Sequence, residues 1–153
     1  MQQALSWCDP ANFKVYMLRE LVNSAFASWL ATNGFSEAEY VFDDKAFGNE
    51  ILVYRSPDAF MRFVNDRGDV YIDVSPPTQD SPEWFLLDNL LQLLGYAAES
   101  FTGGRESQMR NVIEALNTDF PRLKAMLRPA DLEQTRKDME ELCRSKIRQM
   151  FPR

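Results

Sequence analysis

Carboxylates are the side chains of this sequence that could do chemistry, because the chain contains no histidine. Histidine is the commonest general base near neutral pH, so its absence removes the usual catalytic triads and most zinc sites. Two carboxyl groups can still hydrolyse a glycosidic bond when they lie about 5–10 Å apart across a cleft. The candidate acids are Asp43, Asp44, Asp66, Asp69 and Asp73.

The spacing of these acids argues against such chemistry. Asp69 and Asp73 share one face of a predicted strand, but four residues along a strand separate them by about 13 Å. Solvated carboxylates on a sheet explain them better. We therefore predict no catalytic residue, no metal ligand and no cofactor, and keep an enzyme that uses carboxylates alone as the less favoured alternative.

Two glycine-containing motifs have structural explanations. Residues 65–69, Asn-Asp-Arg-Gly-Asp, lack the alternating ligands and distal glutamate of an EF-hand loop. An Arg-Gly-Asp adhesion signal would need an extracellular protein, whereas a hairpin turn accounts for every residue, with Gly68 able to adopt positive φ. Residues 103–105, Gly-Gly-Arg, lack the spacing and the lysine of a phosphate loop and fit a hinge.

The cysteines and the N-terminal residues point to a reducing compartment. Cys8 and Cys143 are far apart and fit no metal or redox spacing. Residues 1–7 lack the basic and apolar regions of a signal peptide. No apolar run approaches the length of about 20 residues that a membrane span needs. We expect a cytoplasmic protein that does not bind membranes.

Charge is distributed unevenly along the chain. Residues 1–104 hold 15 acidic and 6 basic side chains, whereas residues 105–153 hold 8 and 11. An acidic body argues against nucleic acid as the main partner. It suits a partner protein with a basic surface, because complementary fields speed association. General acidity for solubility explains the same numbers equally well.

The elements that position these residues begin with a long helix. Asp9 can cap this helix, and Pro10 fits its first position. Apolar residues between Leu18 and Leu30 recur every three or four positions and form one broad face. Gly34 is placed to end the helix.

After the helix the apolar pattern changes to the two-residue period of strands. Turn residues divide this region into four short strands that form an antiparallel meander. In the last strand, alternate residues point to opposite faces, as in a sheet with one packed and one exposed face. The predicted strands are residues 39–43, 50–55, 60–65 and 69–75, and in the last of them Val70, Ile72 and Val74 oppose Asp69, Tyr71, Asp73 and Ser75.

Helices follow the sheet. Residues 81–83, Ser-Pro-Glu, predict a helix start, with Trp84 and several leucines on its buried face and Gly95 at its end. Pro121 should break or kink a later helix. The last helix, from about residue 130 to residue 150, has one apolar and one basic side. Intrahelical ion pairs explain the basic side better than nucleic-acid binding does.

Together these patterns predict one α+β domain. Its four-stranded antiparallel meander is flanked by an N-terminal helix and a helical C-terminal region. Residues 1–98 form the α+β body, residues 99–107 a linker-like loop, and residues 108–153 the helical region. The apolar stripe of the last helix fits docking either on the body or on a second copy, so a homodimer stays open.

One stretch resembles a known class of proteins. Residues 59–76, Ala-Phe-Met-Arg-Phe-Val-Asn-Asp-Arg-Gly-Asp-Val-Tyr-Ile-Asp-Val-Ser-Pro, are followed by Glu83-Trp84 and a leucine-rich helix. This hairpin and helix resemble small α+β immunity proteins of bacterial toxin systems. The resemblance implies a cytosolic inhibitor that binds one cognate toxin, often through an acidic surface that plugs a basic active site. It implies no fixed set of contact residues.

The predicted function is therefore protein binding through an acidic face of the sheet. Residues 37–99 carry 13 acidic and 4 basic side chains. Tyr71 would be the aromatic anchor that such interfaces favour. A secretion-chaperone-like or adaptor protein is the alternative. The predicted partner-binding residues are Asp43, Asp44, Asp69, Tyr71 and Asp73.

Overall fold

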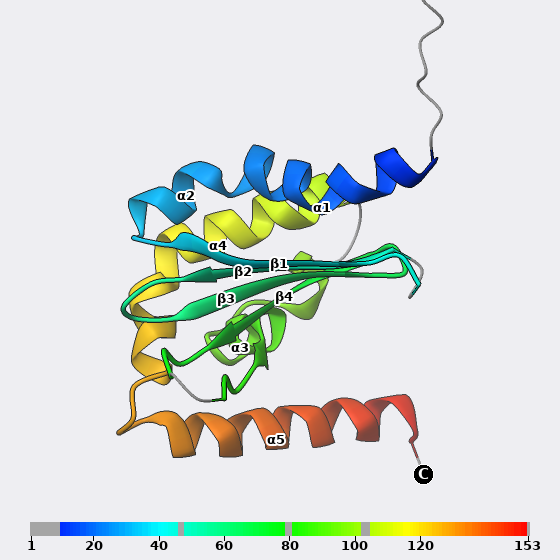
Figure 1. The fold of residues 1–153 in the computed structure, drawn as a ribbon. Coiled ribbons are helices and arrows are strands. Elements are labelled where there is room, and N and C mark those ends of the chain that lie inside the picture. Colours follow the sequence, from blue (N-terminus) through cyan, green and yellow to red (C-terminus); the bar gives the residue numbers. More distant parts are fainter. Residues whose placement is uncertain (1–9, 46–47, 79–80, 102–104, 153) are drawn as a thin grey trace, which may run out of the picture.

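The computed structural model describes residues 10–45, 48–78, 81–101 and 105–152. An N-terminal pair of helices precedes four long strands, and a mostly helical C-terminal part follows them (Figure 1). The elements are α1 (Pro10–Ala25), α2 (Ala27–Thr32), β1 (Ser36–Asp43), β2 (Asn49–Arg55), β3 (Phe60–Asp66), β4 (Asp69–Ser75), β5 (Phe85–Leu86), α3 (Leu87–Leu93), the 3₁₀ helix η1 (Ala98–Phe101), α4 (Arg105–Met126) and α5 (Leu132–Met150).

The strands form one antiparallel sheet in the order β1-β2-β3-β4-β5. This order confirms the predicted α+β class and meander, with each long strand within three residues of its predicted start. The fifth strand was not predicted. Phe85 and Leu86 pair with the edge of β4 before α3 begins, so the expected helix start at residues 81–83 is wrong.

The β3–β4 turn confirms the predicted hairpin. Asp66 lies opposite Asp69, so the loop consists of two residues, Arg67 and Gly68. Both adopt positive φ, 53° and 94° respectively. That backbone shape matches the right-handed twist of the two strands it joins. The side chain of Asn65 accepts a hydrogen bond from the Gly68 N–H and braces the turn.

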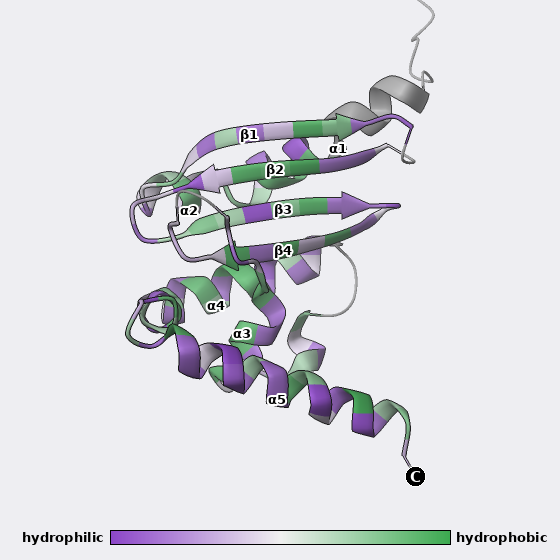
Figure 2. Ribbon diagram, turned by 60° about the horizontal axis from the view of Figure 1, so that its bottom comes forward, coloured by the Kyte–Doolittle hydropathy of each residue, from purple (hydrophilic) through white to green (hydrophobic). Residues whose placement is uncertain are grey.

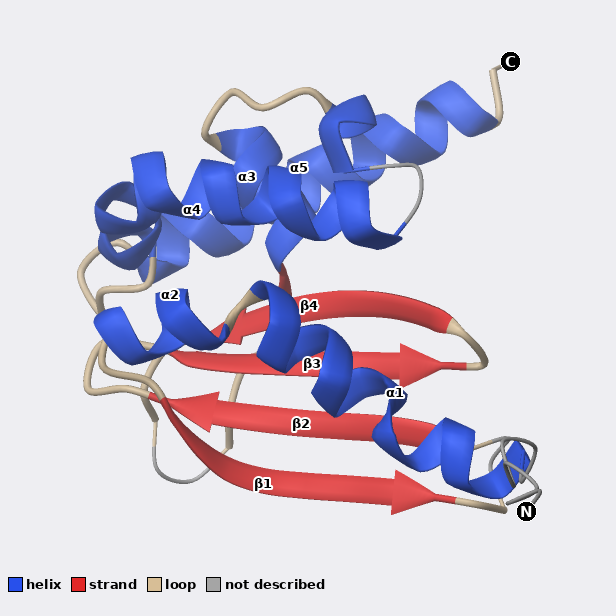
Figure 3. Cartoon of the chain, turned by 90° about the horizontal axis from the view of Figure 1, so that it is seen from above, coloured by secondary structure: helices blue, strands red, loops and turns tan. Residues whose placement is uncertain are grey.

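Helices cover one face of the sheet and leave the other without a helical layer. Helices α1 and α2 lie over the first face, and α4 lies beside α1 toward the β4 edge, whereas α3 and α5 lie beyond β4 (Figures 1 and 3). The core between the helices and the covered face contains the edge-to-face pair Phe26–Phe63, with ring centroids 5.0 Å apart. Trp29 meets Phe120 of α4 in the same geometry at 4.8 Å. This packing fixes the sheet and therefore positions its second face.

The N-terminal helix is divided where the sequence predicts one continuous helix. Helix α1 ends at Ala25 and α2 begins at Ala27, while the side chain of Phe26 between them is fully buried. Gly34 adopts φ 76° just after α2, as its predicted role at the helix end requires.

The C-terminal helices differ from the prediction in detail. Helix α4 continues through Pro121 to Met126, and its direction changes over its last third, so the proline bends the helix without ending it (Figure 1). Part of the loop predicted at residues 99–107 is helical, because η1 reaches Phe101 and α4 begins at Arg105. The other residues of that loop, 102–104, lie outside the described residues, as does Cys8.

Candidate functional site

The face of the sheet opposite α1, α2 and α4, called the open face below, carries an apolar row across all four long strands. Val41 of β1 lies opposite Ile51, Ile51 opposite Val64, and Val64 opposite Tyr71 of β4. Residues in direct register share one side of a sheet, so these four side chains form a continuous line. No described helix lies over this side of β1, β2 and β3 (Figure 2). Val41 exposes 41% of its surface.

Carboxylates gather at one end of the open face. They come from the β1–β2 turn and the β3–β4 turn, which lie at the same end of the sheet, where Figure 2 shows hydrophilic strand ends beside the hydrophobic middle. Asn49 links the two turns, because its amide donates to Asp66 at 3.1 Å and its carbonyl oxygen accepts from the Arg67 N–H at 2.9 Å. The acidic end, as this group is called below, consists of Asp43, Asp44, Asp66 and Asp69.

The acidic end is partly neutralised by its own chain. Asp43 accepts a hydrogen bond from the backbone N–H of Lys45 at 3.0 Å. The Arg67 guanidinium lies 3.9 Å from Asp66. Both acids are exposed, and exposed pairs of this kind contribute little energy and exchange readily. Asp44 and Asp69 are exposed as well, so a negative potential remains at this end of the face.

Asp73 lies on the open face as predicted, but it is not the solvated carboxylate that the sequence indicates. It exposes 6% of its surface, and the Arg62 guanidinium donates two hydrogen bonds to one of its oxygens, at 2.6 and 2.9 Å. Burial raises the pKa of Asp73, and the contact with Arg62 opposes that rise. The register explains the pair, because Arg62 and Asp73 lie directly opposite each other on β3 and β4.

An aromatic ring completes this part of the open face. The Arg62 guanidinium lies over the ring of Trp84, 4.5 Å from its centroid. Trp84 is half-buried and precedes β5, so it covers part of β3 and does not start the buried face of a helix. Tyr71 is half-buried beside this cluster, and burial, followed by the charge of Asp73, raises its pKa. Tyr71 therefore stays a neutral, amphipathic ring at physiological pH.

Glu50 is buried and therefore does not add to the acidic surface that the sequence predicts for residues 37–99. Its side chain is fully buried on the covered face. It accepts hydrogen bonds from the Tyr40 hydroxyl at 3.0 Å, the Asn65 amide at 3.1 Å and the Leu18 N–H at 3.3 Å. All three donors are neutral, and they tie α1, β1 and β3 to β2. The strand period could have placed Glu50 on the inner side with Leu52.

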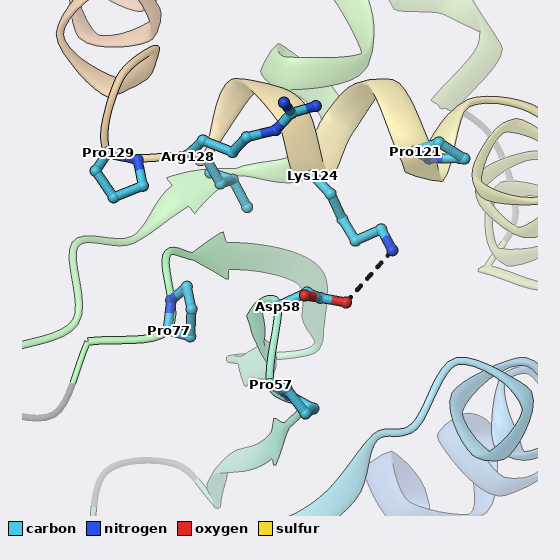
Figure 4. Close-up of a pocket in the computed structure, with 8 residues that line it drawn as sticks. Pro57, Asp58, Pro77, Pro121, Lys124, Arg128 and Pro129 are labelled. Carbon is cyan, nitrogen blue, oxygen red and sulfur yellow. Dashed lines mark hydrogen bonds and ion pairs between the residues drawn. The ribbon is translucent and has the colours of Figure 1, made fainter.

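A cleft lies at the opposite end of the molecule from the acidic end. It encloses about 470 Å³ and is lined by four prolines, Pro57, Pro77, Pro121 and Pro129, together with charged residues of α4 (Figure 4). Lys124 reaches across it to Asp58 at 3.4 Å, while Arg128 forms no ion pair with another described residue. Proline carries no N–H, and the side chains of this lining that can donate hydrogen bonds are those of Lys124 and Arg128.

Within the described ranges, no group of three or more Cys, Asp or Glu residues is arranged to hold a metal ion. No described helix is both long and apolar enough to cross a membrane.

The predicted site residues divide into two sets. Asp43, Asp44 and Asp69 lie at the acidic end, and Tyr71 and Asp73 lie along β4.

Compared with known proteins, the chain matches no protein-family model, no curated sequence and no solved structure.

Proposed function

We propose that this chain is a protein-binding inhibitor, and that the open face of its sheet holds a partner protein with a basic surface. The observation that supports the proposal most is the apolar row from Val41 to Tyr71, which crosses four strands beside the acidic end without a described helix over β1, β2 and β3. Apolar centres with a polar rim are the usual anatomy of protein interfaces.

The residues of the open face divide the work of binding. Tyr71 supplies a large ring with a polar tip at the β4 end of the apolar row, the kind of residue that dominates binding energy. Asp43, Asp44 and Asp69 supply negative potential at the rim, which steers a basic partner and sets orientation more than affinity. Asp73 holds Arg62 in place over Trp84 and shapes the surface from within.

The most specific form of the proposal is an immunity protein that neutralises a cognate toxin in the cytosol. The β3–β4 hairpin with its Arg67-Gly68 turn carries the resemblance to that class, and the acidic end lies at the tip of this hairpin. A basic toxin active site placed against the acidic end would be occupied by carboxylates in place of its anionic substrate. An adaptor that uses the same face without inhibiting its partner is the alternative.

Affinity capture with face-specific variants tests the proposal. The tagged full chain is used to capture partners from the cytosol of its native host, beside the double variant Asp43→Lys/Asp69→Lys. The expected result is one stoichiometric basic protein that the wild type retains and the double variant loses roughly tenfold or more, because the reversed charges repel it. Capture should weaken further at high salt.

A matched control separates the face from the net charge. Glu20→Lys/Glu114→Lys changes the net charge equally, but its two sites are exposed on α1 and α4, on the covered side of the sheet. It should capture the partner as the wild type does. The proposal fails if both double variants capture equally, or if no partner of the wild type depends on the open face.

A further inference from the structure

Helix α5 is held to the body mainly through its first half. Arg136 donates to both carboxylate oxygens of Glu83, at 2.7 to 3.0 Å, and holds the helix to the segment before β5. Thr135 and Met139 are its buried residues. In the second half, Lys146 donates to Asn89 of α3. This attachment leaves one side of the last three turns facing solvent.

That side is apolar. Ile147 exposes 55% of its surface, Met150 65% and Phe151 73%. Among the described residues, the only other exposed large apolar side chain is Val41, at 41%, in the apolar row of the open face. The end of α5 therefore leaves three large apolar side chains in water, and the open face leaves one, Val41, beside the half-buried Ile51 and Tyr71. Exposed apolar patches are commonly interaction sites.

The two surfaces have opposite charge. After Glu141 the described part of α5 carries Arg144, Lys146 and Arg148 and no acid. The acidic end of the open face carries four carboxylates near Lys45 and Arg67. Arg144 and Arg148 pair with Glu140 and Glu141 on their own helix, but all four side chains are more than 60% exposed, so these pairs can exchange for others.

The two surfaces also lie where a two-fold axis can bring them together. Helix α5 lies on the side of the sheet away from α1 and α2 (Figure 1). Its C-terminal end and the β1–β2 and β3–β4 turns lie at the same end of the molecule in all three views (Figures 1, 2 and 3). A two-fold interface needs two complementary patches side by side on one surface, because each copy then presents both halves of the contact.

We propose that this chain forms a two-fold symmetric homodimer in which the exposed end of α5 from each copy lies on the open face of the other. Ile147, Met150 and Phe151 cover the apolar row, and Arg144 and Arg148 face the acidic end. The dimer does not rest on the proposed function, but it occupies the same face. Self-association and capture of a basic partner therefore exclude each other.

Sedimentation equilibrium of the full chain tests the dimer. Between about 1 and about 300 µM the wild type should associate with a dissociation constant on the order of 10 µM, as expected for a small interface. Ile147→Asp/Phe151→Asp should stay monomeric over this range, because the buried charges oppose contact. Ile147 and Phe151 are exposed in the monomer, so the melting temperature of the variant should change little.

Charge reversal with rescue is the decisive arm. Self-association should weaken roughly tenfold or more in each of two variants, Arg144→Glu/Arg148→Glu and Asp43→Lys/Asp69→Lys. A mixture of the two variants should restore self-association. In the mixed dimer, the acidic α5 end of one variant meets the basic open face of the other, and the second contact joins a native α5 end to a native open face. Arg110→Glu/Lys137→Glu changes the net charge as the first variant does, at exposed sites elsewhere, and should dimerise like the wild type.

A monomeric wild type, or a mixture that associates no better than its components, overturns the dimer. The two proposals fail separately. Arg144→Glu/Arg148→Glu should still capture the basic partner, so partner capture by a monomeric chain rejects only the dimer. A rescued dimer without any partner dependent on the open face rejects only the proposed function.

Discussion

The two faces of the sheet bury apolar side chains by different means. On the covered face, Leu52, Met61 and Phe63 lie on the strands that α1 packs against and are fully buried. On the open face, Val53 and Val64 expose only 6% each without a described helix over them. Arg62 lies directly opposite Val53 and two residues before Val64, on the same face. Burial of the thin apolar layer on the open face therefore depends on the polar side chains around it, such as Arg62 and Asp73, which form its polar frame.

This difference predicts unequal penalties for truncation at adjacent positions of β3. Phe63→Ala should lower the free energy of unfolding by about 3–5 kcal/mol, since it removes a ring that packs against both Phe26 and Tyr54. Val64→Ala removes two methyl groups from the thin layer and should lower it by about 1–2 kcal/mol. Urea unfolding measures both. Equal losses would mean that the two faces are packed alike.

Glu50 offers the next largest contrast, because the covered face buries a carboxylate among neutral donors. Glu50→Ala removes the acceptor that the Asn65 amide and the Leu18 N–H share, and should destabilise the fold by about 2–4 kcal/mol. Glu50→Gln keeps one acceptor oxygen and removes the buried charge, so its unfolding free energy should lie within about 1 kcal/mol of the wild type. If Gln is as damaging as Ala, the charge itself is required.

Arg62 and Asp73 test the polar frame of the open face. Arg62→Ala leaves a buried carboxylate without its partner and uncovers Trp84, and should lower the free energy of unfolding by about 1–3 kcal/mol. The double variant Arg62→Met/Asp73→Leu replaces the pair with apolar groups and should recover most of that loss. Chemical denaturation of the wild type, Arg62→Met, Asp73→Leu and the double variant measures the coupling between the two side chains. Additive losses would show that the pair contributes no coupling energy.

Local patterns in the sequence were enough to predict most of the sheet. The Arg67-Gly68 turn needs positive φ at two adjacent residues, and its neighbours supply the alternation of the two strands, so that hairpin could be found without tertiary information. The same turn also sets the register that places Arg62 opposite Asp73. The ion pair could therefore have been inferred, had the register been extended four residues along each strand from the Asp66–Asp69 pair.

Features that depend on tertiary contacts were missed. Phe85 and Leu86 have the spacing of the leucine-rich helix that follows, and only the free edge of β4 makes them a strand. Trp84 was expected inside a helix face and instead lies over Arg62. The exposure of Ile147 and Met150 depends on how far α3 extends beneath α5, which no local pattern reports. For the candidate site, the sequence placed Asp69, Tyr71 and Asp73 on one face of the last strand, but it identified neither the apolar row that begins at Val41 nor the burial of Asp73.

The last and smallest predicted effect concerns acid. In the helical layer, Asp119 accepts a hydrogen bond from the Tyr96 hydroxyl at 2.6 Å and pairs with Arg122, and these contacts hold its pKa below the usual value. On the open face, burial raises the pKa of Asp73. The two carboxyls should therefore contribute to acid unfolding with opposite signs, although both are acids close to a guanidinium.

The signs follow from which state binds the proton more tightly. A carboxyl with a lowered pKa stabilises the fold above the pKa of the unfolded chain, about 4, and that stabilisation is lost as the pH falls through the folded value. Asp119→Asn should therefore be less stable than the wild type near pH 7, with the difference disappearing in acid. A raised pKa acts the other way, because folding then favours the protonated form. Asp73→Asn should lose stability more steeply than the wild type as the pH falls. Thermal melts between about pH 7 and about pH 2.5 separate the two cases. If the melting temperatures of the two variants fall in parallel with pH, Asp119 and Asp73 do not differ in this way.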